Sequence, residues 1–357
     1  MTDRSGIRLC DLTTLRTGGT ASHATSAESL DELVDAVRSA DATSRDLLLI
    51  GDGSNLVAPD EGWAGDVVLI RTRAVDASRG AGEYVQVRIA AGEPWDEIVA
   101  RSVDAGWSGL ECLSGIPGRT GATPVQNVGA YGQTVADSIS GVEIFDRDTD
   151  QRMSWSAAAC RFGYRDSRFK HTDRFVVLCV GFQLRRSRQS APIRYPELAA
   201  RLGLEVGERA PTADVRAAVL DLRRSKGMVL DAADHDTWSA GSFFTNPILT
   251  AAEYARFTQR AAAHLGAAAQ WPAYPDVRGH KLSAAWLIEQ AGFAKGYARG
   301  AAAVSGKHTL ALTNRGAATS TDILALAAEI TARVESTFGV PLHAEPRIPR
   351  FSPPCGH

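Results

Sequence analysis

Two glycine-rich segments contain the residue types that bind phosphate groups in proteins. The first, GDGSN at positions 51–55, follows a short apolar run at 46–50. Glycines let backbone N–H groups converge on an anion, and Ser54 and Asn55 could add side-chain hydrogen bonds to a diphosphate. Position 56 is Leu and no Gly-Lys-Ser/Thr follows, which excludes the dinucleotide fingerprint and the P-loop. A plain tight turn is an equal alternative for this segment.

The second segment is longer and covers residues 115–132, with five glycines among them. Each ordered glycine loses more backbone entropy than another residue would, so a purely structural loop rarely contains so many. Close approach of the backbone to a large, flat, phosphate-bearing cofactor would explain the composition.

Three later residues have side chains suited to acid–base or electrostatic chemistry, and each also has an ordinary structural explanation. Arg165 lies beside Asp166, with which it could form a structural ion pair. Ser242 has neither a Gly-x-Ser-x-Gly motif nor a nearby His, so it reads as a buried hydroxyl bonded to the backbone. Glu345 precedes Pro346 and Arg347 and could be a salt-bridged surface residue.

Helical and strand patterns alternate around these residues and indicate α+β domains. The pattern TSAE at 25–28 predicts a capping box that opens a helix through residue 37. A further helix is expected from Pro94 to Gly106. The remaining expected helices are 212–226, 283–291 and 320–338, and the expected strands are 46–50, 67–71, 84–90, 142–145, 175–184 and 309–313. Residues 185–190 are expected to form an exposed connection.

Composition excludes several classes of protein. The chain of 357 residues is 44% hydrophobic, which excludes disorder as its main state, and its formal net charge of -2 argues against a general nucleic-acid binder. The five cysteines, at 10, 112, 160, 179 and 355, are odd in number and lack metal-ligand spacing. No apolar stretch is long enough to span a membrane. We therefore expect a cytoplasmic protein without a metal site, a nucleic-acid partner or a membrane partner.

Five sequence blocks, in order along the chain, resemble the UDP-N-acetylenolpyruvoylglucosamine reductase family, also called UDP-N-acetylmuramate dehydrogenase. The blocks are GDGSN at 51–55, SGIPG at 114–118 with QNVGAYG at 126–132, CRFGYRDS at 160–167, GSFFTNP at 241–247 and EPR at 345–347. The resemblance is to the longer, type I branch of the family. Thr245 stands where many relatives have Lys, and Gly227 follows Lys226 where Leu-Pro is expected.

The resemblance implies a role for each matching residue. Arg165, Ser242 and Glu345 would be catalytic: Arg165 and Glu345 would stabilise an enol intermediate, and Ser242 would give a proton to the substrate carbon. The implied substrate contacts are Tyr164, Tyr195, Lys226 and Asn246. The implied cofactor contacts are Gly51, Gly53, Ser54, Asn55, Gly115, Ile116, Pro117, Gly118, Gly121, Gln126, Asn127, Gly129, Ala130, Tyr131 and Gly132.

The resemblance also implies a fold and a reaction. The fold would be a two-part FAD-binding region of the vanillyl-alcohol-oxidase type, at 1–75 and 76–226, followed by an α+β substrate-binding domain at 227–347. Residues 348–357 would return to the first part. The reaction would be reduction of UDP-N-acetylglucosamine enolpyruvate by NADPH through non-covalent FAD, in peptidoglycan precursor synthesis. Separately from the resemblance, the lack of a repeat or heptad pattern leads us to expect a monomer.

Two other functions stay open. One is a flavoprotein oxidase of the same fold group that acts on an alcohol or hydroxy acid, although many such relatives attach flavin through a His or Cys near the first glycine turn, and residues 51–55 include neither. The other is a flavin- or UDP-sugar-binding regulator without turnover, against which the set of Arg165, Ser242 and Glu345 argues.

Overall fold

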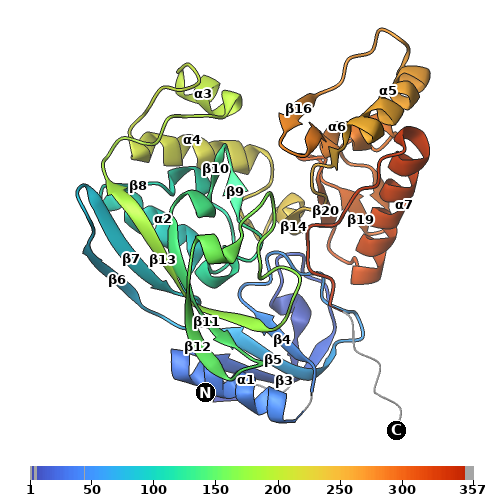
Figure 1. Cartoon of the computed structure of the whole chain (residues 1–357). Helices are drawn as coiled ribbons and strands as arrows, with labels where there is room; N and C mark the ends of the chain where they lie inside the picture. Colours follow the sequence, from blue (N-terminus) through green and yellow to red (C-terminus); the bar gives the residue numbers. More distant parts are fainter. Residues whose placement is uncertain (1, 4–5, 44, 350–357) are drawn as a thin grey trace.

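The first part of the molecule is a small sheet covered by one helix (Figure 1). A computed structural model describes residues 2–3, 6–43 and 45–349. The crossover from β3 through α1 to β4 leaves β5 between the two strands and parallel to both. Leu33, Val34 and Val37 of α1 are fully buried against this sheet. The elements are β1 (Thr2–Asp3), β2 (Ile7–Arg8), β3 (Thr20–Ala27), α1 (Leu30–Ala42), β4 (Leu47–Ile50) and β5 (Trp63–Ile70).

The capping box expected at 25–28 is wrong. Residues 20–27 form β3, whose Ala24 to Ala27 stretch pairs with Val67 to Ile70 of β5. The helix begins at Leu30, and the Ser29 side chain before it accepts a hydrogen bond from the Glu32 backbone N–H while the Glu32 carboxylate accepts one from the Glu28 N–H. Sheet pairing with residues 43 positions further along the chain therefore overrides the local capping signal.

The second part is a six-stranded antiparallel sheet with the 12-residue strand β13 at its centre. Val176 and Leu178 of β13 pack in the core beneath α1, whereas Val180 and Phe182 pack with Trp95 of α2. Burial on two faces explains why residues 175–184 read as a continuous apolar run. The elements are β6 (Val75–Arg79), β7 (Tyr84–Ala90), α2 (Trp95–Asp104), β8 (Trp107–Ser108), β11 (Ile139–Asp146), β12 (Gln151–Ser156) and β13 (Phe175–Arg186).

A helical lobe follows β13 and lies above the second sheet (Figure 1). It consists of α3 (Pro196–Leu202) and α4 (Thr212–Ser225), which share a small core that includes Leu198, Val215 and Val219. The expected exposed connection at 185–190 is wrong at its start, because Arg185 and Arg186 continue β13 by pairing with Ser108 and Trp107.

The third part packs three helices on an antiparallel sheet and carries a small hairpin sheet. Helix α5 is not among the helices predicted from the sequence, although Thr250 and Glu253 form a capping box at its start. The sheets are β14 (Ser239–Ser242), β20 (Ala311–Asn314), β19 (Ala302–Val304) and β18 (Ala298–Arg299), and β15 (Ile248–Leu249), β17 (Gly279–Leu282) and β16 (Ala273–Asp276). The helices are α5 (Ala251–Leu265), α6 (Ala284–Gln290) and α7 (Ser320–Phe338).

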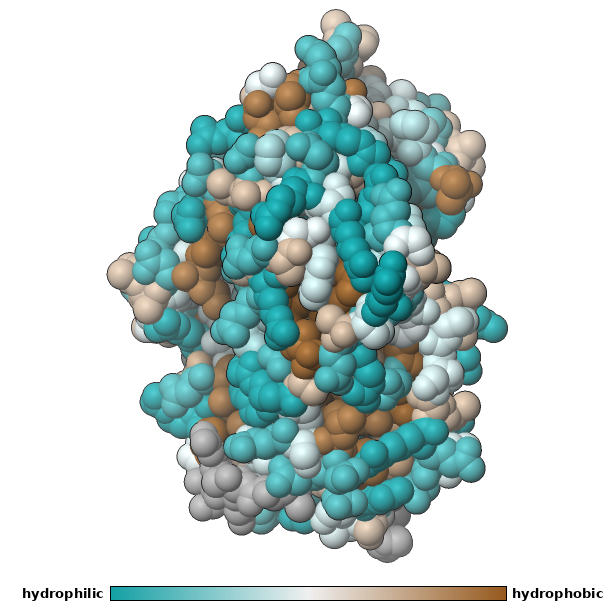
Figure 2. Space-filling model, turned by 90° about the vertical axis from the view of Figure 1, so that its left-hand side faces the viewer, coloured by the Kyte–Doolittle hydropathy of each residue, from teal (hydrophilic) through white to brown (hydrophobic). Residues whose placement is uncertain are grey.

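The remaining observations concern the molecular surface, membrane-spanning segments and the predicted boundaries. Figure 2 shows one face on which hydrophilic residues separate smaller hydrophobic areas. Within the described ranges, no helix combines the length and the apolar character needed to cross a membrane. The domain boundaries at 75 and 226 stay predictions. The expected return of residues 348–357 lies outside the described residues from position 350 onward.

Candidate active site

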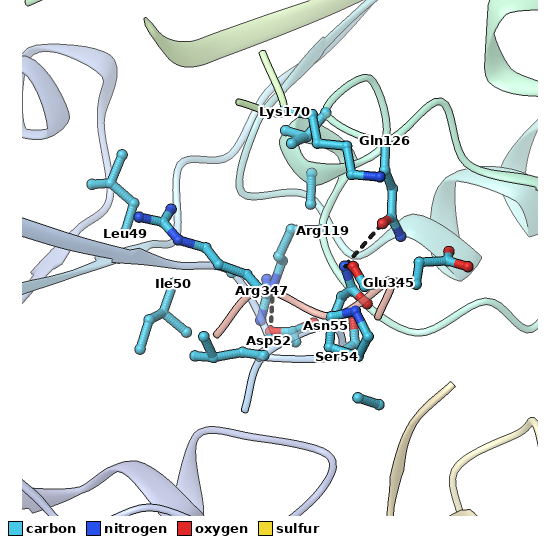
Figure 3. A pocket seen from close by; sticks show the side chains of 18 of the residues that line it. Leu49, Ile50, Asp52, Ser54, Asn55, Arg119, Gln126, Lys170, Glu345 and Arg347 are labelled. Carbon is cyan, nitrogen blue, oxygen red and sulfur yellow. Dashed lines mark hydrogen bonds and ion pairs between the residues drawn. The ribbon is translucent and has the colours of Figure 1, made fainter. Parts of the chain in front are cut away.

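A cleft of about 1030 Å³ lies where the three parts meet. The carboxyl end of β4, the glycine segments, the turn around Arg165, the end of β14 and residues 344–349 all contribute to its lining. Figure 3 shows side chains of the first glycine turn and of the chain's last described segment on the same part of this lining. Segments from each third of the sequence therefore enclose one space.

The two glycine segments are hydrogen-bonded to each other on the lining of the cleft. The Ser54 hydroxyl donates to the Pro117 carbonyl at 3.1 Å, and Arg119 Nε donates to the Asp52 carboxylate at 2.6 Å (Figure 3). Gly118 has φ +119°, and a Cβ atom there would lie 2.8 Å from Ser54 Oγ. The first segment is thus more than a tight turn, because it forms one wall of the cleft.

Gly53 is the glycine whose replacement has the clearest expected effect. Its φ is +57°, and an added Cβ would lie 2.2 Å from the Leu12 carbonyl oxygen. Gly203 is a matched control, with φ +69° and no atom within 4 Å of its Cβ position. We expect Gly203→Ala to lower the free energy of unfolding by about 1 kcal/mol and Gly53→Ala by about 2–4 kcal/mol. Urea denaturation at saturating flavin measures both, and equal losses would contradict the steric argument.

The lining fits a flat, phosphate-bearing cofactor. Leu49, Ile50 and Ile116 supply apolar surface, and glycines keep the walls close. Arg223 adds a cation whose Nε is buried without a hydrogen-bond partner among the described residues, while its Nη2 donates to the Met228 carbonyl at 2.7 Å. Burial lowers the pKa of Arg223 to about 10, so the guanidinium stays charged at neutral pH. An anionic ligand would satisfy that buried donor.

The predicted cofactor contacts divide into three groups. Those on the lining of the cleft are Gly51, Gly53, Ser54, Asn55, Ile116, Pro117, Gly118, Gln126 and Gly129. Gly121 lines a smaller adjoining cavity. The others are on the lining of neither cavity: Gly115, Asn127, Ala130, Tyr131 and Gly132. Asn127, for example, supports the turn around Arg165 by donating to the Gly163 carbonyl at 2.9 Å.

Arg165 lies at the corner of a tight turn and points its guanidinium toward Glu345. Gly163 and Asp166 close the turn through two backbone hydrogen bonds, and Arg165 has φ +52°. Lys170 Nζ donates to the Arg165 carbonyl at 2.6 Å. Arg165 Nε is 3.3 Å from Glu345 Oε1. The structural ion pair with Asp166 is not formed, because the Asp166 carboxylate contacts the Ser167 N–H and His171.

The backbone of Glu345 is hydrogen-bonded to the segment after β14 and to the first glycine segment. Its N–H donates to the Phe243 carbonyl at 2.8 Å, and its carbonyl accepts from Asn55 Nδ2 at 3.3 Å. Asn55 Nδ2 also donates to Gln126 Oε1 at 2.9 Å (Figure 3). The Glu345 side chain is only 9% exposed, and this burial raises its pKa despite the opposing charges of Arg165 and Lys170. The alternative of a surface glutamate is therefore wrong.

Ser242 ends β14 and also lines the cleft. Its Oγ is 3.5 Å from Nε2 of His308, a distance at the long end of hydrogen bonding. Burial lowers the pKa of His308 to about 4, and the charges of Lys226 and Lys295 add to this effect, so the imidazole is neutral near pH 7. No histidine lies near Ser242 in the sequence, so this contact was not predicted.

The four predicted substrate contacts form two clusters outside the cleft lining. Tyr195 packs edge-on against Tyr131 with ring centroids 5.4 Å apart, and Lys226 Nζ is 2.5 Å from the Glu197 carboxylate. In the other cluster, Lys281 Nζ lies 5.2 Å from the Tyr164 ring centroid. Asn246 belongs to the same cluster. Its side-chain oxygen accepts a hydrogen bond at 2.9 Å from the N–H of Ala284, the first residue of α6. The roles of these four residues in binding substrate stay predictions.

Sequence reasoning did not select four charged or titratable side chains that the structure brings to the site: Arg119, Lys170, Arg223 and His308. Arg119 belongs to the second glycine segment, and Lys170 follows the CRFGYRDS block by three residues. Proximity to those motifs was the available signal. Arg223 and His308 lie in segments without such a motif, so only the fold identifies them.

The comparisons with known proteins define first the class and then the family. Residues 21–152 match the model described as "FAD binding domain", and together with the reductase matches that follow this makes the protein an FAD-dependent oxidoreductase. Residues 232–349 match the model described as "UDP-N-acetylenolpyruvoylglucosamine reductase, C-terminal domain". The expected α+β fold class and FAD as the cofactor are thereby confirmed.

Whole-chain relatives extend this result. The UDP-N-acetylenolpyruvoylglucosamine reductase of Thermobifida fusca is 56% identical over 95% of this chain and 96% of its own length. That of Salinispora arenicola is 53% identical over 94% of this chain and 92% of its own. The chain belongs to the UDP-N-acetylenolpyruvoylglucosamine reductase family. The crystal structure of the Thermus caldophilus enzyme shares the fold, with a TM-score of 0.65, 24% identity, and coverage of 97% of this chain and 99% of that one.

Proposed function

We propose that this protein reduces UDP-N-acetylglucosamine enolpyruvate to UDP-N-acetylmuramate with NADPH, in peptidoglycan precursor synthesis. Bound FAD would supply the hydride chemistry that links NADPH to the terminal carbon of the enolpyruvyl group. Family membership supports the reaction. The assignment of residues rests on the partly buried Arg165–Glu345 pair, which lines the same cleft as Ser242.

Arg165 and Glu345 are proposed to stabilise the negative charge that hydride addition places on the substrate carboxylate. The planar guanidinium of Arg165 can donate two parallel hydrogen bonds to a carboxylate. Burial raises the pKa of Glu345, and in its protonated form this side chain would donate a hydrogen bond to the same group. Because Glu345 is buried, these interactions act in a region of low dielectric, where they are stronger than in water.

Ser242 is proposed to supply the proton that completes the lactyl ether. An alcohol is a weak acid, but the enolate-like intermediate is basic enough to take its proton when the two groups are already in place. The position of Ser242 at the end of a strand gives its hydroxyl the fixed position that this step requires.

The proposed function predicts that oxidation of NADPH depends on the enolpyruvyl substrate. A flavin-loaded sample should consume NADPH rapidly only when that substrate is present, and the product should be UDP-N-acetylmuramate by mass spectrometry. UDP-N-acetylglucosamine is the matched control, because it lacks the enolpyruvyl group and should give no stimulation. Lack of stimulation by the enolpyruvyl compound would contradict the proposal.

The same sample tests the oxidase alternative. We expect acid precipitation to leave a colourless pellet and a yellow supernatant, because FAD is held without a covalent bond. A yellow pellet would favour a flavoprotein oxidase with attached flavin. A cytoplasmic location and a monomeric state complete the proposal and rest on the sequence-based expectations above.

A further inference from the structure

The hydroxyl of Ser242 lies close to the imidazole of His308. The sequence did not single out this histidine, and the proposed function gives it no role. His308 belongs to the loop between β19 and β20, and its Nε2 is 3.5 Å from Ser242 Oγ. Both residues are partly exposed, and Ser242 lines the cleft. The contact thus joins the proposed proton donor to a second titratable side chain.

Backbone hydrogen bonds fix the two residues relative to each other. Ser242 pairs with Ala311 of β20, and the neighbouring Phe243 N–H donates to the Leu310 carbonyl at 2.6 Å. The loop is closed by a hydrogen bond from the Ser305 N–H to the Ala311 carbonyl at 2.8 Å and by one from the His308 N–H to Ser305 Oγ at 3.3 Å. Strand β14 and the loop therefore form one rigid unit, so the approach of His308 to Ser242 is built into the sheet.

The surroundings keep this imidazole neutral. Burial lowers the pKa of His308 most, the charges of Lys226, Lys295 and Arg223 lower it further, and Glu197 offsets them only in part. A neutral imidazole carries one N–H, and the other ring nitrogen is an acceptor. With the hydrogen on Nε2, His308 donates to Ser242 Oγ and leaves the serine hydrogen free to point at the substrate carbon.

We propose that His308 is a positioning residue for the reduction, donating an Nε2–H hydrogen bond to Ser242 Oγ that orients the hydroxyl and stabilises the oxyanion left after proton transfer. This inference rests on the proposed function. In that step the serine O–H bond breaks as the substrate C–H bond forms, and the electron pair stays on Oγ. A proton from solvent water then restores the hydroxyl. A donor already in place needs no rearrangement when the charge develops.

Two amide substitutions test the position of the donor. The side-chain N–H2 of Gln can occupy the place of the imidazole Nε2, whereas the shorter Asn places its amide near Nδ1. In the FAD-loaded protein reduced with one equivalent of NADPH, stopped-flow mixing with UDP-N-acetylglucosamine enolpyruvate measures flavin reoxidation. We expect His308→Asn to slow reoxidation by about 100-fold and His308→Gln by less than about 5-fold. Reduction by NADPH should stay near the wild-type rate in both.

A double variant separates positioning from a general structural effect. If His308 acts through Ser242, His308→Asn should slow reoxidation no further in a Ser242→Ala background. The inference is overturned by wild-type reoxidation in His308→Asn, by equal losses in the Asn and Gln variants, or by loss of bound FAD or of NADPH reduction in both. Failure of the wild-type protein to be reoxidised by this substrate would instead refute the proposed function.

Discussion

Replacing Ser242 by Ala should leave the reduction of bound flavin by NADPH near its wild-type rate and slow reoxidation by the enolpyruvyl substrate about 10³- to 10⁴-fold. The reason is that the serine hydroxyl is proposed to supply the proton for the substrate carbon, whereas hydride transfer from NADPH requires no such proton. Single-turnover stopped-flow measurements of the two half-reactions test this separation directly.

Ser239 provides the matched control on the same strand. Its hydroxyl oxygen accepts a hydrogen bond from the Gly241 N–H at 3.2 Å, and Ser239 does not line the cleft. Ser239→Ala should therefore lower stability slightly and leave both half-reactions within about 3-fold of wild type. Fast reoxidation in Ser242→Ala would show that another group supplies the proton.

Replacing Arg165 by Lys should lower kcat/KM for the enolpyruvyl substrate by about 10²- to 10³-fold, which corresponds to the loss of one strong transition-state hydrogen-bonding group. Lys keeps the charge but cannot form two parallel hydrogen bonds to a carboxylate. Steady-state kinetics with varied substrate at saturating NADPH measure the loss, and the rate of flavin reduction should change little.

Arg161 is the matched control for backbone conformation. It has φ +50°, close to the +52° of Arg165, and it is exposed in the same segment. Arg161→Lys should leave kcat/KM within about 2-fold. Combining Arg165→Lys with Glu345→Gln should cost less than the sum of the single losses, because the two side chains are in contact at 3.3 Å. Additive losses would indicate that the pair does not act together.

Elements with a strong local pattern were predicted well from the sequence. Helix α7 has the expected bounds of 320–338, because its apolar face, its N-cap Thr319 and its C-terminal Gly339 are all encoded locally. The start of α1 was wrong because pairing with β5 claims the residues of the apparent capping box. A sheet contact depends on residues far away in the chain, which a local pattern does not include.

The glycine segments illustrate the same division within the site. Their composition predicted a phosphate-bearing ligand, because the demand for positive φ and close backbone approach is a property of each segment. That Ser54 bonds Pro117, 63 residues further on, is a result of how two sheets pack together. The sequence could therefore indicate two walls of a site but not that they face each other.

The sequence by itself determined the family and the chemical character of the site, because the residue types of its five blocks, Arg165, Ser242 and Glu345 among them, are legible without coordinates. Only the tertiary structure decided which groups interact. It paired Arg165 with Glu345 rather than with the adjacent Asp166, buried Glu345, and placed His308 against Ser242. The Arg165–Glu345 and Ser242–His308 contacts join residues that are 180 and 66 positions apart, because burial, electrostatics and hydrogen bonding depend on distance in space rather than along the chain.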